Sequence, residues 1–165
     1  MLTARNQCLT LRSGRVGLIS DTHGLLRPEA LGALKGSELI IHAGDIGKPE
    51  VLESLTSIAP VIAIRGNNDR GPWMKKLPDV FNAEINGVKI HVIHNVKEME
   101  SDPLGDGFKL VVSGHTHKPS AVNRDGIVFI NPGSAGPRRF KLPVTVARLN
   151  LGSKIPGARI IELKV

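Results

Sequence analysis

The sequence predicts a mixed α/β fold in which two packed β-sheets are flanked by helices, and three observations support this prediction. In the first half, short apolar runs alternate with helix-like segments, as in parallel strands joined by helical crossovers. In the second half, extended runs follow one another with turn residues between them, as in hairpins. With 165 residues, 41% of them hydrophobic, the chain is long enough to bury a core of its own.

The apolar periodicity places each element in turn. In the first half we expect strands at 16–20, 39–41 and 61–64, and helices at 28–34 and 49–58 between them. Pro28 suits a first helical turn. In the second half, Asn86-Gly87 predicts a hairpin between 81–85 and 88–93. Further strands are expected at 110–112, 120–123, 127–130, 144–149 and 159–163, and an exposed loop at 98–107.

The chain reads as one domain over residues 15–165, preceded by a flexible tail at 1–14. The one cysteine, Cys8, excludes an internal disulfide and a zinc site built on several thiolates. No apolar run approaches the roughly 18 residues of a membrane span, and the first residues lack the apolar stretch of a secretory signal. We therefore expect a cytoplasmic protein that does not enter a membrane.

The charge balance favours an anionic partner. Lys and Arg number 22 against 15 Asp and Glu, a formal charge of +7, which fits nucleic acid, a membrane surface or a phosphorylated small molecule. Aromatic residues make up only 3% of the chain and tyrosine is absent, so stacking of single-stranded bases is disfavoured. Nucleic acid is thus an unlikely partner except as a substrate.

Metal-binding residue types follow five of the predicted strands. They are two carboxylates, one amide and four imidazoles: Asp21, His23, Asp45, Asn67, His94, His115 and His117. Because open α/β sheets place their ligand sites at strand carboxyl ends, these loops can converge. Seven ligands exceed the needs of one zinc ion and suit a two-metal centre with a bridging carboxylate. His91 competes with His94 for the fourth strand, and His42 and His91 fit structural roles better.

These motifs, in this order, resemble the calcineurin-like metallophosphoesterases. The resemblance rests on Asp21-Thr22-His23, Gly44-Asp45, Gly66-Asn67-Asn68-Asp69, His94 and Gly114-His115-Thr116-His117, and it is strongest to the small YfcE-type phosphodiesterases related to the retromer subunit Vps29. Asn131-Pro132-Gly133-Ser134 matches that branch too. The resemblance implies a four-layer α-β-β-α sandwich.

The resemblance also implies a ligand set for two divalent ions. Asp21, His23, Asp45 and His117 would hold one ion, and Asp45, Asn67, His94 and His115 the other, with Asp45 as the bridge. Such mixed ligands suit manganese, and also nickel, iron or zinc. The reaction implied is hydrolysis of a small or nucleotide-like phosphodiester by a hydroxide that bridges the two ions.

Two residues depart from the family pattern. Asn68 stands where the phosphoprotein phosphatases have a catalytic histidine, so it cannot protonate a leaving group, although its amide can donate to a substrate phosphate. Asn95 replaces the usual glycine after His94, and we expect the turn to survive because Asn tolerates positive φ. Arg138, after the Gly-Ser loop, is a candidate contact to the substrate phosphate.

We therefore predict a phosphodiester hydrolase, with Asp45 and Asn68 in its catalytic machinery and a homo-oligomer as one possible assembly. Two alternatives remain open. The first is a Vps29-like interaction scaffold with a vestigial metal site, and the second is a nuclease, which the charge of +7 motivates.

Overall fold

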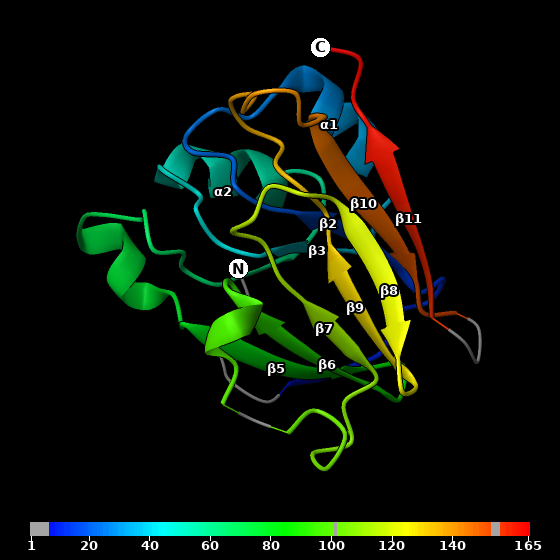
Figure 1. Cartoon of the computed structure of the whole chain (residues 1–165). Coiled ribbons are helices and arrows are strands. Elements are labelled where there is room, and N and C mark those ends of the chain that lie inside the picture. The colour runs from blue at the N-terminus through cyan, green and yellow to red at the C-terminus, as the bar shows by residue number, and fades with distance from the viewer. Residues whose placement is uncertain (1–6, 101, 153–155) are drawn as a thin grey trace.

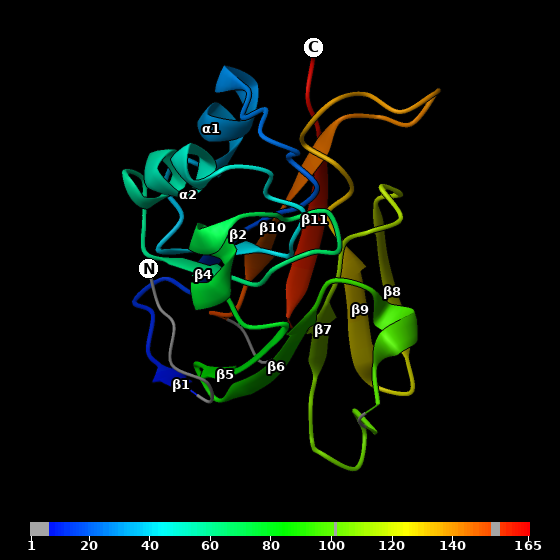
Figure 2. The same ribbon diagram turned by 90° about the vertical axis from the view of Figure 1, so that its left-hand side faces the viewer.

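Two β-sheets pack face to face in the computed structural model, which describes residues 7–100, 102–152 and 156–165 (Figures 1 and 2). The five-stranded sheet has the order β11-β10-β2-β3-β4. Its strands are β2 (Arg15–Ile19), β3 (Leu39–His42), β4 (Val61–Ala63), β10 (Thr145–Asn150) and β11 (Gly157–Glu162). β2, β3 and β4 run parallel, and β10 is antiparallel to both β2 and β11.

The six-stranded sheet has the order β1-β5-β6-β7-β9-β8. Its strands are β1 (Gln7–Leu9), β5 (Val80–Ile85), β6 (Val88–Ile93), β7 (Leu110–Val112), β8 (Ser120–Arg124) and β9 (Ile127–Asn131). Two antiparallel hairpins, β5–β6 and β8–β9, lie on either side of β7, which pairs in parallel with β6 and with β9. The hairpin predicted from Asn86-Gly87 is confirmed, with both residues at positive φ as a tight turn of this kind requires.

The main core lies between the two sheets. Alternate residues of each sheet point inward, among them Leu18, Ile41 and Ile62 from one side and Phe81, Ile90 and Val112 from the other. A second core lies under the helices α1 (Pro28–Leu34) and α2 (Pro49–Thr56), which both cover the outer face of the five-stranded sheet (Figure 2). Each helix begins with a proline in its first turn, where the missing N–H costs nothing.

The outer face of the six-stranded sheet carries a thinner layer than a four-layer sandwich implies. Ile93, Val111 and Ile127 are buried there under Val96 and Met99, which belong to the segment around the 3₁₀ helix η2 (Val96–Glu98). A 3₁₀ turn and a loop thus cover this apolar face. Another 3₁₀ helix, η1 (Pro72–Lys76), follows β4, in a stretch for which the periodicity predicted no element.

The predicted flexible tail differs from the structure over residues 7–14. Gln7–Leu9 form β1, which pairs in parallel with β5, and Asn86 Oδ1 accepts a hydrogen bond from the Leu11 amide at 2.8 Å. Residues 1–6 lie outside the described part of the chain. The sequence did not predict β1 because an edge strand of three residues has almost no detectable periodicity of apolar residues.

The topology determines where the site forms. β2, β3 and β4 in one sheet, and β6, β7 and β9 in the other, are parallel within their sheets, so the carboxyl ends of each set share one edge.

No helix among the described residues is long and apolar enough to cross a membrane.

Candidate metal centre

The loops after β2, β3, β4, β6 and β7 carry the seven predicted ligands, and the structure brings them together. The side-chain ligand atoms of Asp21, His23 and His117 lie within 4.8 Å of one another, as do those of Asp21, Asp45 and His94. Asn67 and His115 join the second group through hydrogen-bond contacts. Three imidazoles from the second half of the chain therefore meet the two carboxylates and His23 from the first half.

The first group is formed by Asp21, His23 and His117. His117 Nε2 lies 3.3 Å from Asp21 Oδ1 and 3.3 Å from His23 Nε2, and the rings of the two histidines stack at a centroid distance of 5.2 Å. Asp21 is fully buried and His117 is 3% exposed. Three nitrogen and oxygen donors thus converge on one point, which is the arrangement of a divalent-metal site.

The second group is formed by Asp45, His94, Asn67 and His115. His94 Nε2 lies 3.5 Å from Asp45 Oδ2 and 3.1 Å from Asn67 Oδ1, and His115 Nδ1 lies 3.0 Å from the same amide oxygen. Asp45 Oδ2 is also 3.9 Å from His23 Nε2, so this carboxylate faces both groups. Asp21 belongs to both groups as well, so the choice of Asp45 as the bridge stays a prediction.

Hydrogen bonds between loops hold the ligands in register. The amides of Asp21 and His23 donate to the carbonyls of Gly44 and Asp45 at 3.0 and 2.9 Å. Across the two sheets, the His115 amide donates to Asp21 Oδ2 at 3.1 Å. The ligand loops therefore form one connected unit.

Five of the seven candidate ligands have left-handed backbone conformations. The φ angles are 53° for Asp21, 46° for His23, 54° for Asp45, 67° for His115 and 60° for His117. Non-glycine residues in this region cost on the order of 1–3 kcal/mol each and persist only where the surrounding structure holds them. Strained conformations of this kind cluster at functional sites, and here they coincide with the predicted ligands.

Gly66 allows the loop after β4 to approach Asp45 closely. A Cβ built on Gly66 would overlap the Asp45 amide nitrogen and carboxylate, with Asp45 Cγ only 2.8 Å away. Next to it, Asn68 binds both carboxylate oxygens of Asp45, with its amide at 2.8 Å from Oδ1 and its Nδ2 at 2.7 Å from Oδ2. In this structure the Asn68 side chain therefore positions Asp45, and one of its two side-chain N–H groups remains for another acceptor.

The environment sets the protonation states of the metal-free site. Burial acts to raise the pKa of Asp45, but hydrogen bonds from His94 and Asn68 outweigh it and hold that pKa well below its usual range. Burial lowers the pKa of His23, opposed by the charges of Asp45 and Asp21. For His94, burial is outweighed by hydrogen bonds to Asp45 and the Ala43 carbonyl, which raise its pKa. An ionised Asp45 and a neutral His23 are the forms that ligate metals.

The donor set fits divalent metal ions. Within the described residues, Asp21 Oδ1 is buried and has no hydrogen-bond partner, although His117 Nε2 lies 3.3 Å from it, and His117 Nδ1 likewise has no hydrogen-bond partner. Buried polar atoms are rarely left without a hydrogen bond, so a carboxylate oxygen in this state beside the imidazole of His117 indicates a place for a cation. His94 Nδ1 lies 2.7 Å from the Ala43 carbonyl, a contact that fixes its ring and leaves Nε2 facing the site.

Several further residues support the site by hydrogen bonds to the ligand loops. Ser20 Oγ donates to Asp21 Oδ2 at 2.7 Å, and Asp69 accepts from the amides of Gly47 and Gly66, both at 2.8 Å. The Asn131 side chain donates to the Gly114 carbonyl at 2.7 Å, and Ser134 Oγ donates to the Asp21 carbonyl at 2.9 Å. The Asn-Pro-Gly-Ser motif is therefore hydrogen-bonded to both the loop after β7 and the loop after β2. The sequence of the motif alone does not reveal this role.

The remaining predicted residues have other surroundings. Asn95 has φ −112°, so the expected left-handed turn is wrong. Its side chain instead accepts from the Lys97 amide at 3.2 Å and caps η2. Arg138 Nη2 donates to the Val165 carbonyl at 3.4 Å. The positive charge of its neighbour Arg139 contributes to lowering the pKa of His23. His91 is buried, with Nδ1 2.8 Å from Asn82 Oδ1 on the neighbouring strand.

A cavity of about 780 Å³ opens beside the second group of ligands. Asn67 and His94 form part of its wall, which also carries the arginines Arg65 and Arg70 and the carboxylates Asp69, Asp79, Glu98 and Glu100. Arg65 is held by the carboxylate of Asp79, and Arg70 Nη1 donates to the Asn67 carbonyl at 2.7 Å. The candidate metal centre thus borders a space large enough for a small phosphoester.

Comparison with known proteins places this geometry in a family. A model of the calcineurin-like phosphoesterase superfamily domain matches residues 15–154. A probable metallophosphoesterase of Methanothermobacter thermautotrophicus is 36% identical over 164 residues, covering 89% of this chain and 91% of that protein. The solved structure of an archaeal phosphodiesterase has a TM-score of 0.74 at 25% identity, covering 89% of this chain and 99% of that one.

The fold is also shared with proteins of the Vps29 type. Vps29 of Chaetomium thermophilum superposes with a TM-score of 0.72 at 14% identity, over 89% of this chain and 96% of that one. This likeness concerns the fold, whereas the family model and the 36% identical relative concern the sequence. The chain belongs to the calcineurin-like phosphoesterase superfamily.

Proposed function

We propose that this phosphoester hydrolase cleaves small or nucleotide-like phosphodiesters with the aid of two divalent metal ions. The observation that supports this most strongly is the pair of ligand groups that share buried carboxylates, with Asp21 Oδ1 left without a hydrogen-bond partner in the described part of the chain. Two-metal sites with a shared carboxylate are typical of enzymes that hydrolyse phosphoesters. A relative described as an archaeal phosphodiesterase has the same fold at 25% identity.

The ligand assignment follows the two groups. Asp21, His23, Asp45 and His117 would hold one ion, and Asp45, Asn67, His94 and His115 the other. When bound, two such ions neutralise charge on the phosphoryl oxygens and lower the pKa of coordinated water. The mixture of oxygen and nitrogen donors without a thiolate suits manganese, and nickel, iron and zinc as alternatives.

The residues of the chain contribute orientation and charge. Asn68 holds both oxygens of Asp45 and can turn its second N–H toward a phosphate oxygen. Arg70 lies beside Asn67 on the wall of the adjacent cavity, and it is an additional candidate contact to the substrate. The proposed phosphate contact of Arg138 stays a prediction.

Proton transfer to the leaving group limits the substrates that the site can use. Asn68 carries no acidic proton, and His42 is buried away from solvent. Diesters with acidic leaving groups, such as nitrophenyl esters, need no protonation when the ester bond breaks. We therefore expect turnover to rise as the pKa of the leaving group falls.

A Vps29-like scaffold is the second candidate, because Vps29 structures share the fold. A scaffold does not need strained ligand conformations or a buried carboxylate oxygen without a hydrogen bond, and the described residues of this chain show both. A nuclease is the third, on the charge of +7. A cytoplasmic location and a homo-oligomer stay predictions.

The test is turnover of a nitrophenyl phosphodiester and the matching monoester by the purified protein, with and without added Mn²⁺. The proposal predicts metal-dependent hydrolysis in which the diester is the better substrate. Bound metal with no hydrolysis of either ester would favour the scaffold. Cleavage of oligonucleotides far exceeding that of the small diester would favour the nuclease.

A further inference from the structure

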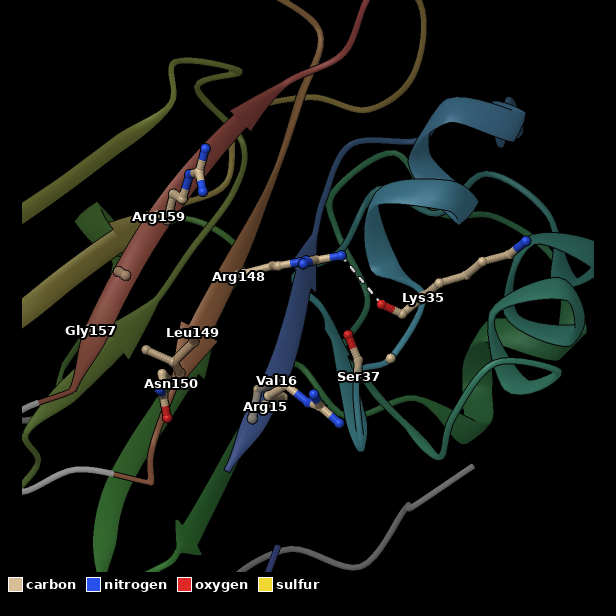
Figure 3. A pocket seen from close by; sticks show the side chains of 11 residues that line it. Arg15, Val16, Lys35, Ser37, Arg148, Leu149, Asn150, Gly157 and Arg159 are labelled. Atoms are coloured by element: carbon tan, nitrogen blue, oxygen red, sulfur yellow. Dashed lines mark hydrogen bonds between the residues drawn. The ribbon is translucent and has the colours of Figure 1, made fainter. Parts of the chain in front are cut away.

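A basic pocket lies at the end of the five-stranded sheet that is opposite to the candidate metal centre (Figure 3). It has a volume of about 420 Å³ and is bordered by β2, β10, β11 and the carboxyl end of α1. Three arginines from three neighbouring strands line it: Arg15, Arg148 and Arg159. Lys35 contributes its carbonyl, and Figure 3 shows its ammonium group pointing away.

The strand register places the three arginines on one face of the sheet. Arg148 pairs directly with Arg159 of β11, and Asn150, two residues further along β10, pairs with Arg15 of β2. Residues that pair directly, and residues two apart on one strand, share a face. This is the outer face that also carries Ile19, Val146 and Ile161 under the helices.

This arrangement is unfavourable without an anion. Arg148 and Arg159 are directly opposite in an antiparallel pair, where like charges destabilise the sheet. Both side chains are exposed, as is Arg15 on the next strand. Side chains directly opposite lie about 5 Å apart at Cβ; Figure 3 shows the Arg148 guanidinium extending toward Lys35 and the Arg159 side chain extending in another direction from β11.

No carboxylate in the described part of the chain offsets these charges. Neither Asp nor Glu lines the pocket, and the ion pairs found among the described residues do not include these arginines. Glu38 is near in sequence to the pocket residue Ser37, but its carboxylate accepts from the Ser13 hydroxyl at 2.6 Å and from the Arg12 and Ser13 amides at 3.0 and 2.8 Å.

One of the arginines is held in place. Arg148 Nε donates to the Ala33 carbonyl at 2.8 Å, and its Nη2 donates to the Lys35 carbonyl at 3.3 Å, so the end of α1 orients the guanidinium (Figure 3). These contacts also give Arg148 a helix-capping role. They do not account for Arg15 and Arg159, for which no side-chain hydrogen bond is seen within the described residues.

We propose that this pocket binds a small molecule carrying two or more linked phosphates, at a site separate from the metal centre. Three guanidinium groups match the charge and the planar hydrogen-bond geometry of a diphosphate or triphosphate group. The volume suits a small ligand, and no aromatic side chain among the lining residues offers a platform for a base. The six residue-to-residue steps from Arg15 to Asp21 span about 20 Å of extended chain, so one phosphate chain does not reach both sites.

The experiment measures binding of inorganic triphosphate to the metal-free protein by titration calorimetry. The test variant is Arg15→Gln/Arg159→Gln, because both side chains are exposed. The matched control is Lys109→Gln/Arg124→Gln, which removes two exposed positive charges, one directly before β7 and one at the end of β8. A further variant, Asp45→Asn, alters the metal centre. Thermal melting of every variant verifies that it is folded.

We expect the dissociation constant to rise about tenfold or more in the test variant, the equivalent of losing two charged contacts, and to stay near the wild-type value in the other two. Equal weakening in the charge-matched control would overturn the proposal, because binding would then follow net charge alone. A clear change of the dissociation constant in Asp45→Asn, such as the tighter binding expected when a carboxylate beside the anion is removed, would place the anion at the metal centre. Binding of an oligonucleotide through Arg15 and Arg159, with none of triphosphate, would also contradict it.

Discussion

Acid should destabilise the metal-free protein through His42, a histidine that is fully buried beneath the ligand loops. Its Nδ1 accepts a hydrogen bond from the Gly44 amide at 3.2 Å, and its Nε2 lies 2.9 Å from Thr22 Oγ1. Because Thr22 Oγ1 already donates to the Ile46 carbonyl, the imidazole must donate through Nε2 and accept through Nδ1. A second proton on Nδ1 would face the Gly44 N–H, so this environment requires neutral histidine.

The magnitude follows from the shift in pKa. Burial lowers the pKa of His42 from 6.5 to about 3, with the charges of Asp21 and Asp45 opposing the shift. The unfolded chain therefore binds more protons than the folded one between these values, so stability is complete above pH 6.5 and falls as the pH drops toward 3. At 1.36 kcal/mol per pKa unit, the loss is about 2 kcal/mol at pH 5 and on the order of 5 kcal/mol at pH 3.

The assay is urea denaturation in the presence of a chelator at pH 7 and pH 5, for the wild type and His42→Gln. Gln keeps a side-chain donor for Thr22 but does not titrate. Other groups titrate in both proteins, so the difference between their pH dependences isolates His42. We expect the wild type to lose about 2 kcal/mol more than the variant between these pH values. Equal pH dependence in the two proteins would refute the assignment of a buried, neutral His42.

Three further predictions concern the metal centre. Gly66→Ala should lower the unfolding free energy by about 1–3 kcal/mol and reduce metal content, because the new Cβ overlaps Asp45. The control is Gly32→Ala, where nothing lies within 4 Å of the added Cβ. Thermal melting and metal analysis should find the stability and the metal content of this control intact. Asn68→Ala should weaken metal binding by about tenfold, because the hydrogen bond from Nδ2 to Asp45 Oδ2 is lost. Metal titration measures this, and unchanged affinity would argue against a role of Asn68 in positioning Asp45. Metal affinity should also fall as the pH drops from 8 to 6, because the raised pKa of His94 lets protons compete, and a flat profile would contradict this.

Much of the fold was predictable because its signals are local. Helix α1 begins at Pro28 and ends at Leu34 as predicted, and β7 has its predicted bounds. β1 was missed because pairing with β5 stabilises it, and that contact is distant in sequence. The cover over Ile93 and Val111 was missed for the same reason, since η2 packs there as a short 3₁₀ turn.

The candidate site was predictable in its residue types and only partly in its geometry. The Asp-x-His and His-x-His spacings identified Asp21, His23 and His117, whose ligand atoms the structure brings within 4.8 Å of one another. Their left-handed conformations, the unpartnered Asp21 Oδ1 and the locking role of Asn131 arise from tertiary contacts. Asn95 was wrongly expected to have positive φ because the caps of 3₁₀ turns leave little trace in sequence.

Metal stoichiometry measured together with phosphodiester hydrolysis tests the central claim most directly. Wild-type protein loaded with Mn²⁺ and freed of excess ion should retain two ions per chain and hydrolyse the diester. Asp45→Asn, which alters the carboxylate that faces both ligand groups, should lose metal and activity together. One ion per chain in the active wild type, or full metal content and full rate in the variant, would contradict the two-metal account.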